Sequence, residues 1–265
     1  MTTLATSARS AEASESYWIA SVGDLPYYSN PTKKPEQFRN LLLLLSYVVL
    51  IINFKTYPQA LGPDAVALAK ELEKTAEQYL RVEVGFAPPA FELPRVVESV
   101  KNPVWAQHLD PAGEGQFTGY LAPSSARKSG AFGTFLNHSE HKTQKEEIKK
   151  TTTLCRELGL KVLVFANSPT RVEEFTGLNP DFIAYEPPEL IGGEVSVTNA
   201  KPEVIKDAVS ASEDIPLFVG AGIHEKRDIE VALSLGAAGA VVSSAVVKAK
   251  DPAKVFADLL SGFKV

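Results

Sequence analysis

The fold of this chain is decided by a pattern that is clearest in Phe182-Ile183-Ala184-Tyr185-Glu186-Pro187-Pro188-Glu189-Leu190-Ile191-Gly192-Gly193. A short apolar run that is bounded by breaker residues predicts a buried strand. Glu186 then stands where this strand opens into a loop. The two prolines fix φ at the start of the loop, and the two glycines leave it free at the end. We therefore expect a strand followed by a lid, with one carboxylate at the base of the lid.

The same pattern recurs along the chain beyond about residue 47. Short apolar, β-branched runs alternate with stretches in which apolar residues have the spacing of a helix. The predicted strands are Tyr47–Ile52, Val82–Phe86, Val104–Gln107, Phe132–Leu136, Lys161–Phe165, Phe182–Tyr185, Pro216–Val219 and Ala238–Val242. Helical spacing is found in Asp64–Leu80, Lys145–Leu158, Lys201–Ser210, Lys226–Leu235 and Ala253–Leu260.

Strands that are apolar throughout are typical of a parallel sheet covered on both faces. Eight strand–helix units in this length predict an α/β fold made of a single (β/α)8 barrel, which takes about 250 residues. A doubly wound open sheet is the structural alternative, but no GxGxxG motif follows any of the predicted strands.

Composition narrows the functional classes. The 265 residues are 45% hydrophobic and 22% charged, which is ordinary for a globular protein with a sizeable core. A net charge of −5 without a strongly basic run gives no electrostatic footprint for nucleic acid. The single cysteine, Cys155, excludes an internal disulfide framework and points to a reducing compartment, so we expect a cytoplasmic protein. Neither a CxxC pair nor an HExxH motif occurs, and we expect no metal and no cofactor.

In a barrel of this type the chemistry lies at the carboxyl ends of the strands, so the residues that follow each run matter most. The first run is followed by Asn53-Phe54-Lys55, the fourth by Asn137-His138-Ser139-Glu140, and the sixth by Glu186. The last two are followed by Gly220-Ala221-Gly222-Ile223 and Ser243-Ser244, whose small residues let backbone N–H groups approach an anion. Each feature alone is more often a solvated loop residue, a cap or a tight turn. Together at one end of a barrel they predict an active site with a phosphate cradle.

These motifs stand in the order and spacing of a known family, together with Ala106-Gln107-His108-Leu109-Asp110-Pro111 and Lys248-Ala249-Lys250-Asp251-Pro252. From about residue 47 to residue 265 the chain resembles triosephosphate isomerase, in the shorter form that is typical of archaea. The resemblance implies interconversion of dihydroxyacetone phosphate and D-glyceraldehyde 3-phosphate through an enediolate, in glycolysis and gluconeogenesis.

The resemblance also implies a role for each site residue. Glu186 would be the base, His138 the electrophile that polarises the carbonyl group, and Lys55 an electrostatic stabiliser. We expect His138 to open a helix, whose positive end would keep the imidazole neutral. Asn53 would hold Lys55 and contact the substrate, and the remaining substrate-binding positions, mainly backbone groups for phosphate, would be Ile191, Gly192, Gly222, Ser243 and Ser244.

Self-association is expected on the same ground. The segment Gly115-Gln116-Phe117-Thr118-Gly119-Tyr120 resembles the family's third loop, which inserts into a neighbouring subunit. Thr118 would be the intersubunit contact, in a homodimer or a homotetramer. An aromatic residue in a loop bounded by glycines is better explained by burial in a partner than by exposure.

The first part of the chain has no counterpart in the family. We expect residues 1–46 to be an N-terminal extension, either disordered or an artefact of the gene model, and residues 47–265 to be the barrel. The leucine-rich run Leu41–Ile52 is too short for a spanning helix, which needs about 20 apolar residues, so no membrane association is expected. An adhesive or membrane-touching extension is the alternative.

Two other functions are compatible with a barrel. One is a different phosphate-binding enzyme, and the other is a non-catalytic scaffold. The combination of Lys55, His138 and Glu186 with the proline-rich lid argues against a different enzyme. It also argues against a scaffold, because a scaffold would have lost at least one of the three residues.

Overall fold

The computed structural model describes residues 48–187 and 202–263 of the chain. The lid segment from Pro188 onward, including Ile191 and Gly192, therefore lies outside the described residues, as does the N-terminal extension. Within the described ranges no helix is long and apolar enough to cross a membrane.

Strands and helices alternate along the chain. The strands are β1 (Val48–Asn53), β2 (Val82–Ala87), β3 (Trp105–Ala106), β4 (Gly133–Leu136), β5 (Lys161–Ala166), β6 (Phe182–Tyr185), β7 (Leu217–Val219) and β8 (Gly239–Val242). The helices are η1 (Pro58–Ala60), α3 (Pro63–Ala76), α4 (Leu93–Val97), α5 (Pro123–Lys128), α6 (Lys145–Glu157), α7 (Pro169–Thr176), α8 (Pro202–Ala211), α9 (Lys226–Ser234), α10 (Ser244–Val247) and α11 (Pro252–Leu260).

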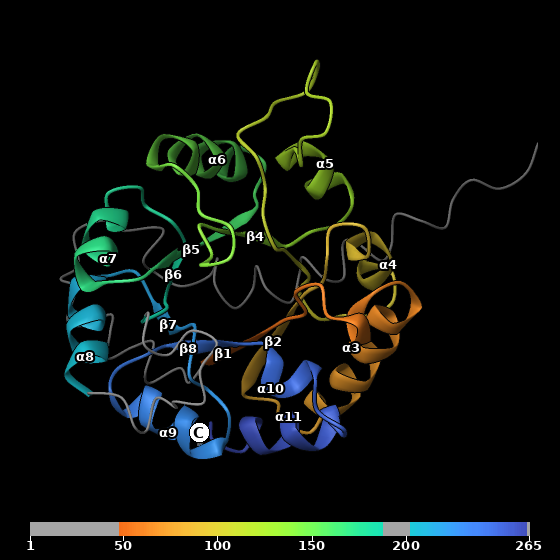
Figure 1. The fold of residues 1–265 in the computed structure, drawn as a ribbon, viewed down its shortest axis with the longest axis vertical. Coiled ribbons are helices and arrows are strands. Elements are labelled where there is room, and N and C mark those ends of the chain that lie inside the picture. Colours follow the sequence, from red (N-terminus) through yellow and green to blue (C-terminus); the bar gives the residue numbers. More distant parts are fainter. Residues whose placement is uncertain (1–47, 188–201, 264–265) are drawn as a thin grey trace, which may run out of the picture. The chain divides into compact units, whose positions relative to one another are not determined.

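The eight strands form one parallel sheet in the order β2-β1-β8-β7-β6-β5-β4-β3. The two ends of this order meet through a parallel bridge between Phe86 and Val104, where the Phe86 N–H donates to the Pro103 carbonyl at 2.9 Å. The helices lie outside the ring of strands (Figure 1). The predicted (β/α)8 barrel is thereby confirmed. The open doubly wound alternative is wrong, because every strand pairs with its neighbours in the sequence and the ring closes.

Both faces of the sheet are buried, as the uninterrupted apolar runs predict. Alternate side chains of β1 illustrate this, because Leu50 and Ile52 pack toward the helices whereas Ile51 belongs to a second cluster inside the barrel. The inner cluster consists of Ile51, Ala87, Trp105, Phe135, Leu163, Phe165, Ala184, Phe218 and Val241. Side chains therefore fill the barrel, and its chemistry is confined to the ends of the strands.

Several predicted boundaries shift in the structure. The helix predicted over Asp64–Leu80 spans Pro63–Ala76, because the chain turns at Tyr79 to enter β2. The short helices α4 and α5 carry too few turns to show a period in the sequence. Helix α7 is marked by local signals instead, since the Ser168 hydroxyl accepts from the Arg171 N–H at 3.2 Å and Pro169 occupies the first turn.

One glycine is required by the packing of the inner cluster. A Cβ atom at Gly133 would lie 2.5 Å from the Lys161 carbonyl oxygen and 2.6 Å from the ring of the buried Trp105. Because the Lys161 oxygen belongs to the neighbouring strand β5, there is no flexible side chain on that side to give way.

We therefore expect Gly133→Ala to lower the free energy of unfolding by about 1–3 kcal/mol, the usual cost of overpacking. Gly177→Ala is the matched control, because its Cβ would meet no atom closer than 3.6 Å and its φ of −62° suits alanine. Urea denaturation of the two variants measures the difference. Equal midpoints would contradict the packing inferred around Trp105.

Candidate active site

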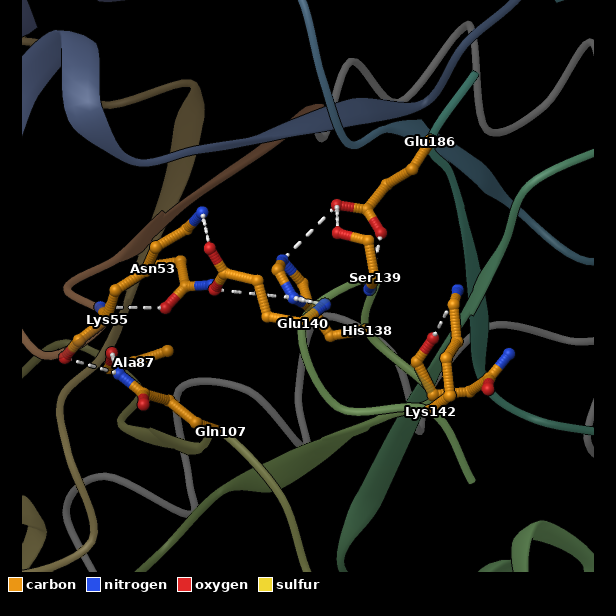
Figure 2. Close-up of polar contacts among 10 residues, drawn as sticks. Asn53, Lys55, Ala87, Gln107, His138, Ser139, Glu140, Lys142 and Glu186 are labelled. Carbon is orange, nitrogen blue, oxygen red and sulfur yellow. Dashed lines mark hydrogen bonds and ion pairs between the residues drawn. The ribbon is translucent and has the colours of Figure 1, made fainter. Parts of the chain in front are cut away.

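Three of the predicted site residues converge where β1, β4 and β6 end. Figure 2 shows that Glu140 contacts both Lys55 and His138, and that His138 contacts Glu186 directly. Asn53 is bonded to Lys55, and Ser139 to Glu186. Each of the three follows a strand whose last residues are buried, so their backbone positions are set by the barrel.

The backbone of Lys55 is held by Asn53 of its own strand, β1, and by Gln107, which follows β3. Its φ of 48° lies in the left-handed region, which is uncommon for a residue with a side chain. The Asn53 side-chain oxygen accepts from the Lys55 N–H at 3.0 Å. The Gln107 amide, which follows β3, donates to the Lys55 carbonyl at 3.1 Å and to the Ala87 carbonyl of β2 at 2.8 Å. These bonds stabilise an unfavourable backbone conformation and aim the lysine, whose Nζ lies 2.7 Å from Glu140 Oε1.

His138 is 9% exposed and has a defined hydrogen-bonding direction. The Glu140 backbone N–H lies 3.1 Å from His138 Nδ1, and because a backbone N–H can only donate, Nδ1 is an acceptor. The neutral ring therefore carries its proton on Nε2, which lies 3.2 Å from Glu186 Oε1.

Burial lowers the pKa of His138 to about 4, helped by the positive charge of Lys55 and opposed by Glu140. The predicted cause of this neutrality was wrong. His138 does not open a helix, because α6 begins only at Lys145, and His138 and Glu140 lie in a turn closed by the His141 N–H donating to the His138 carbonyl at 2.9 Å. Desolvation, not a helix dipole, keeps the imidazole uncharged.

Glu186 is 3% exposed, and its carboxyl group contacts two residues of the turn after β4. The Ser139 N–H donates to Oε2 at 3.0 Å, and the Ser139 hydroxyl donates to Oε1 at 3.3 Å. Burial raises the pKa of Glu186 to about 7, although the Ser139 bonds and the charge of Lys142 oppose the rise. A carboxyl group with such a pKa is a base that ionises near neutral pH.

Gly220 makes room for the Glu186 side chain. A Cβ atom at Gly220 would lie 2.8 Å from Glu186 Cγ and 3.3 Å from Phe165 Cε1. Its backbone N–H also donates to the Tyr185 carbonyl at 2.8 Å, which ties the end of β7 to the end of β6. From the sequence alone, Gly220 was predicted only to be part of the phosphate-binding segment.

The expected phosphate cradle lies partly within the described residues. Gly222, with a φ of 73°, follows β7, and Ser243 and Ser244 follow the neighbouring strand β8. The Ser243 hydroxyl is buried and has no hydrogen-bond partner among the residues that the structure describes. Among the described residues no hydrogen bond or ion pair joins Gly222, Ser243 or Ser244 to Lys55, His138 or Glu186. Ile191 and Gly192 fall outside the described ranges.

Three residues support the site in ways that the sequence did not predict: Gln107 and Ser139 were given no role, and Gly220 was predicted only as part of the phosphate cradle. Each directly follows a strand or lies within a quoted motif, so position was the available signal. Among the described residues no group of three or more His, Cys, Asp or Glu side chains is arranged to hold a metal ion. What the arrangement provides is a base, a neutral hydrogen-bond donor and a cation that faces them.

Comparison with known proteins identifies the family of this chain. The family profile described as Triosephosphate isomerase matches residues 48–262. The chain is 43% identical over 216 residues to the triosephosphate isomerase of Saccharolobus solfataricus, covering 80% of this chain and 95% of the relative. It is 36% identical over 217 residues to that of Methanocaldococcus jannaschii, covering 80% and 99% respectively.

The chain belongs to the triosephosphate isomerase family. The resemblance inferred from the strand-end motifs, including the archaeal form, is therefore confirmed. A different phosphate-binding enzyme is no longer an alternative, because the match spans all eight strands and helices α3 to α11.

For a triosephosphate isomerase, Gly220 gives a direct test of the geometry around Glu186. We expect Gly220→Ala to reduce kcat/KM by on the order of 10- to 100-fold, because the added methyl group displaces the Glu186 side chain and small misplacements cost this much. Gly177→Ala should leave turnover unchanged in the same coupled assay. Full activity of Gly220→Ala would show that the Glu186 position does not depend on this contact.

Proposed function

We propose that this chain interconverts dihydroxyacetone phosphate and D-glyceraldehyde 3-phosphate through an enediolate, with Glu186 as the base and His138 as the electrophile. The observation that carries the assignment is the 3.2 Å approach of Glu186 Oε1 to His138 Nε2. This approach joins a buried carboxyl of raised pKa to a neutral imidazole of lowered pKa. Such a divergence of two neighbouring pKa values supports the proposed roles of Glu186 and His138.

The proton transfer follows from the chemistry of the substrate. The Glu186 carboxylate removes a proton from carbon 1 of dihydroxyacetone phosphate. The electrons of the broken C–H bond form the C1–C2 double bond of the enediolate, and the carbonyl electrons move onto oxygen. His138 would pass the hydroxyl proton of oxygen 1 to oxygen 2, and return of the carbon-bound proton from Glu186 to carbon 2 then gives the aldehyde. Because both Glu186 oxygens accept hydrogen bonds from Ser139, this base must exchange those bonds for the substrate.

His138 supports this transfer as a donor. Its Nε2–H would donate to the substrate oxygen on which negative charge develops, and a donor already fixed by the Glu140 N–H needs no reorganisation. A neutral ring is the appropriate donor here, because an imidazolium would be unfavourable in a buried position beside Lys55.

Lys55 supplies the positive charge. Its ammonium group would stabilise both the phosphate and the enediolate, and its partner in the structure is Glu140, whose side chain is 58% exposed. Asn53 would hold Lys55 and contact the substrate, which its bond to the Lys55 N–H supports. The phosphate would be bound at Gly222, Ser243 and Ser244, together with Ile191 and Gly192 on sequence grounds.

The reaction and the base are tested together by a coupled assay with glyceraldehyde 3-phosphate. We expect turnover by the wild type and a loss of roughly 10²–10⁴-fold in kcat for Glu186→Gln, which keeps the side-chain shape but removes the base. The matched control is Glu203→Gln, an exposed glutamate on α8, which should retain wild-type activity. Absence of turnover by the folded wild type would favour the non-catalytic scaffold.

Self-association through the loop around Thr118 is a further part of the proposal. Phe117 and Tyr120 are 42% and 54% exposed, and their rings contact each other at 5.7 Å between centroids. Exposed aromatic residues of this kind suit burial against a second copy in a homodimer or homotetramer.

Light scattering should give a mass above that of one chain, and Thr118→Arg should lower this mass. A monomeric wild type would contradict the proposal.

We also propose that residues 1–46 are an extension and that residues 47–265 form the catalytic unit, in a cytoplasmic protein. The family match supports this division, since it begins at residue 48. A chain shortened to residues 47–265 should keep the kcat of the full chain. Loss of soluble, active protein on shortening would show that the extension belongs to the functional unit.

A further inference from the structure

A stacked pair of histidines lies beside the turn that carries His138. The rings of His108 and His141 are 4.0 Å apart between centroids with an interplanar angle of 25°. His108 follows β3, and its side chain is only 11% exposed, whereas His141 lies in the turn after β4 and is exposed. The proposed mechanism uses neither ring.

The partners of His108 fix its position from the β3 side. Its Nε2 lies 3.4 Å from Asp110 Oδ1, and the other oxygen of Asp110 accepts from the Leu121 N–H at 2.6 Å. The Asp110 N–H also donates to the Leu121 carbonyl at 2.9 Å. Asp110 thus closes the base of the loop between residues 110 and 121, and His108 rests on this closed base.

The partners of His141 connect it to the active site. Its backbone N–H donates to the His138 carbonyl, so His141 ends the same turn whose Glu140 N–H fixes His138 Nδ1. Any movement of His141 therefore changes the turn that orients the catalytic ring.

The turn is anchored on the opposite side by an unrelated contact. The Asn137 amide donates to the Phe165 carbonyl of β5 at 2.8 Å, and its oxygen accepts from the Thr143 N–H at 3.1 Å. In the sheet β4 lies between β5 and β3, so the turn after β4 has a neighbour on each side. Asn137 holds the turn on the β5 side. On the β3 side, within the described residues, the turn makes its side-chain contact through the stacking of His141 on His108.

We propose that His108 and His141 are positioning residues for His138, whose stacked rings hold the catalytic turn against the loop that follows β3. This inference rests on the proposed function, since it assumes that His138 acts on the substrate. The rings act by contact and not by charge, so the effect should be present at pH 8, where ordinary imidazoles are neutral. Because phosphate binding involves other strands, loss of the stack should affect kcat more than KM.

The test compares kcat and KM at pH 8 for single and paired substitutions. We expect His141→Ala to lower kcat on the order of tenfold with KM changed by less than about twofold, because the carbonyl donor is misplaced. His141→Phe keeps a flat ring without the imidazole nitrogens and should restore most of kcat. His108→Ala and the double variant should show about the same loss as His141→Ala, because the two rings act as one unit.

His224→Ala is the matched control, since His224 is exposed after β7 and shows no ring stacking in the described part of the chain. It should keep wild-type kcat. Unchanged kcat in His141→Ala, an additive loss in the double variant, or failure of His141→Phe to restore turnover would each overturn the proposal. An inactive wild type would instead refute the proposed function, so the two failures are distinguishable.

Discussion

Burial of the Glu186 carboxyl group is the constraint on which the rest of the site depends. An ionised carboxylate that is almost fully removed from water is costly, and its pKa rises unless donors compensate. Here the compensation comes from the Ser139 N–H and hydroxyl and from the positive charges of Lys142 and Lys55. Compensation is incomplete, which leaves the group able to ionise near neutral pH while still accepting a proton. A fully solvated glutamate would be a weaker base.

The same desolvation acts in the opposite direction on His138. Burial disfavours the imidazolium, and Lys55 adds to this effect, so the ring stays neutral beside a carboxylate that would otherwise attract a proton to it. The barrel makes this possible because the two residues follow different strands, β4 and β6, which lie on either side of β5 in the sheet. Gly220 completes the arrangement from β7 by leaving space for the Glu186 side chain.

Much of the fold was predictable because its signals are local. The apolar run Phe182–Tyr185, ended by Glu186 and Pro187, places both the strand and the carboxylate correctly. The contacts that tune the site were not predictable, because they join residues far apart in the sequence. Examples are the Gln107 bonds to Lys55 and Ala87 and the Ser139 bonds to Glu186. The expected helix at His138 was wrong because a short turn and a helix start have the same local residue preferences.

Burial makes His138 a neutral donor, with its proton on Nε2, that faces the buried carboxyl group of Glu186. Nuclear magnetic resonance of the protein labelled with ¹⁵N-histidine tests this directly, with His138 assigned by comparison with the His138→Asn variant. We expect the His138 ring to stay neutral from pH 8 down to about pH 5, with Nδ1 unprotonated, because its pKa is lowered to about 4. A His138 ring that takes up a proton near pH 6.5, or whose neutral form carries its proton on Nδ1, would contradict this protonation state.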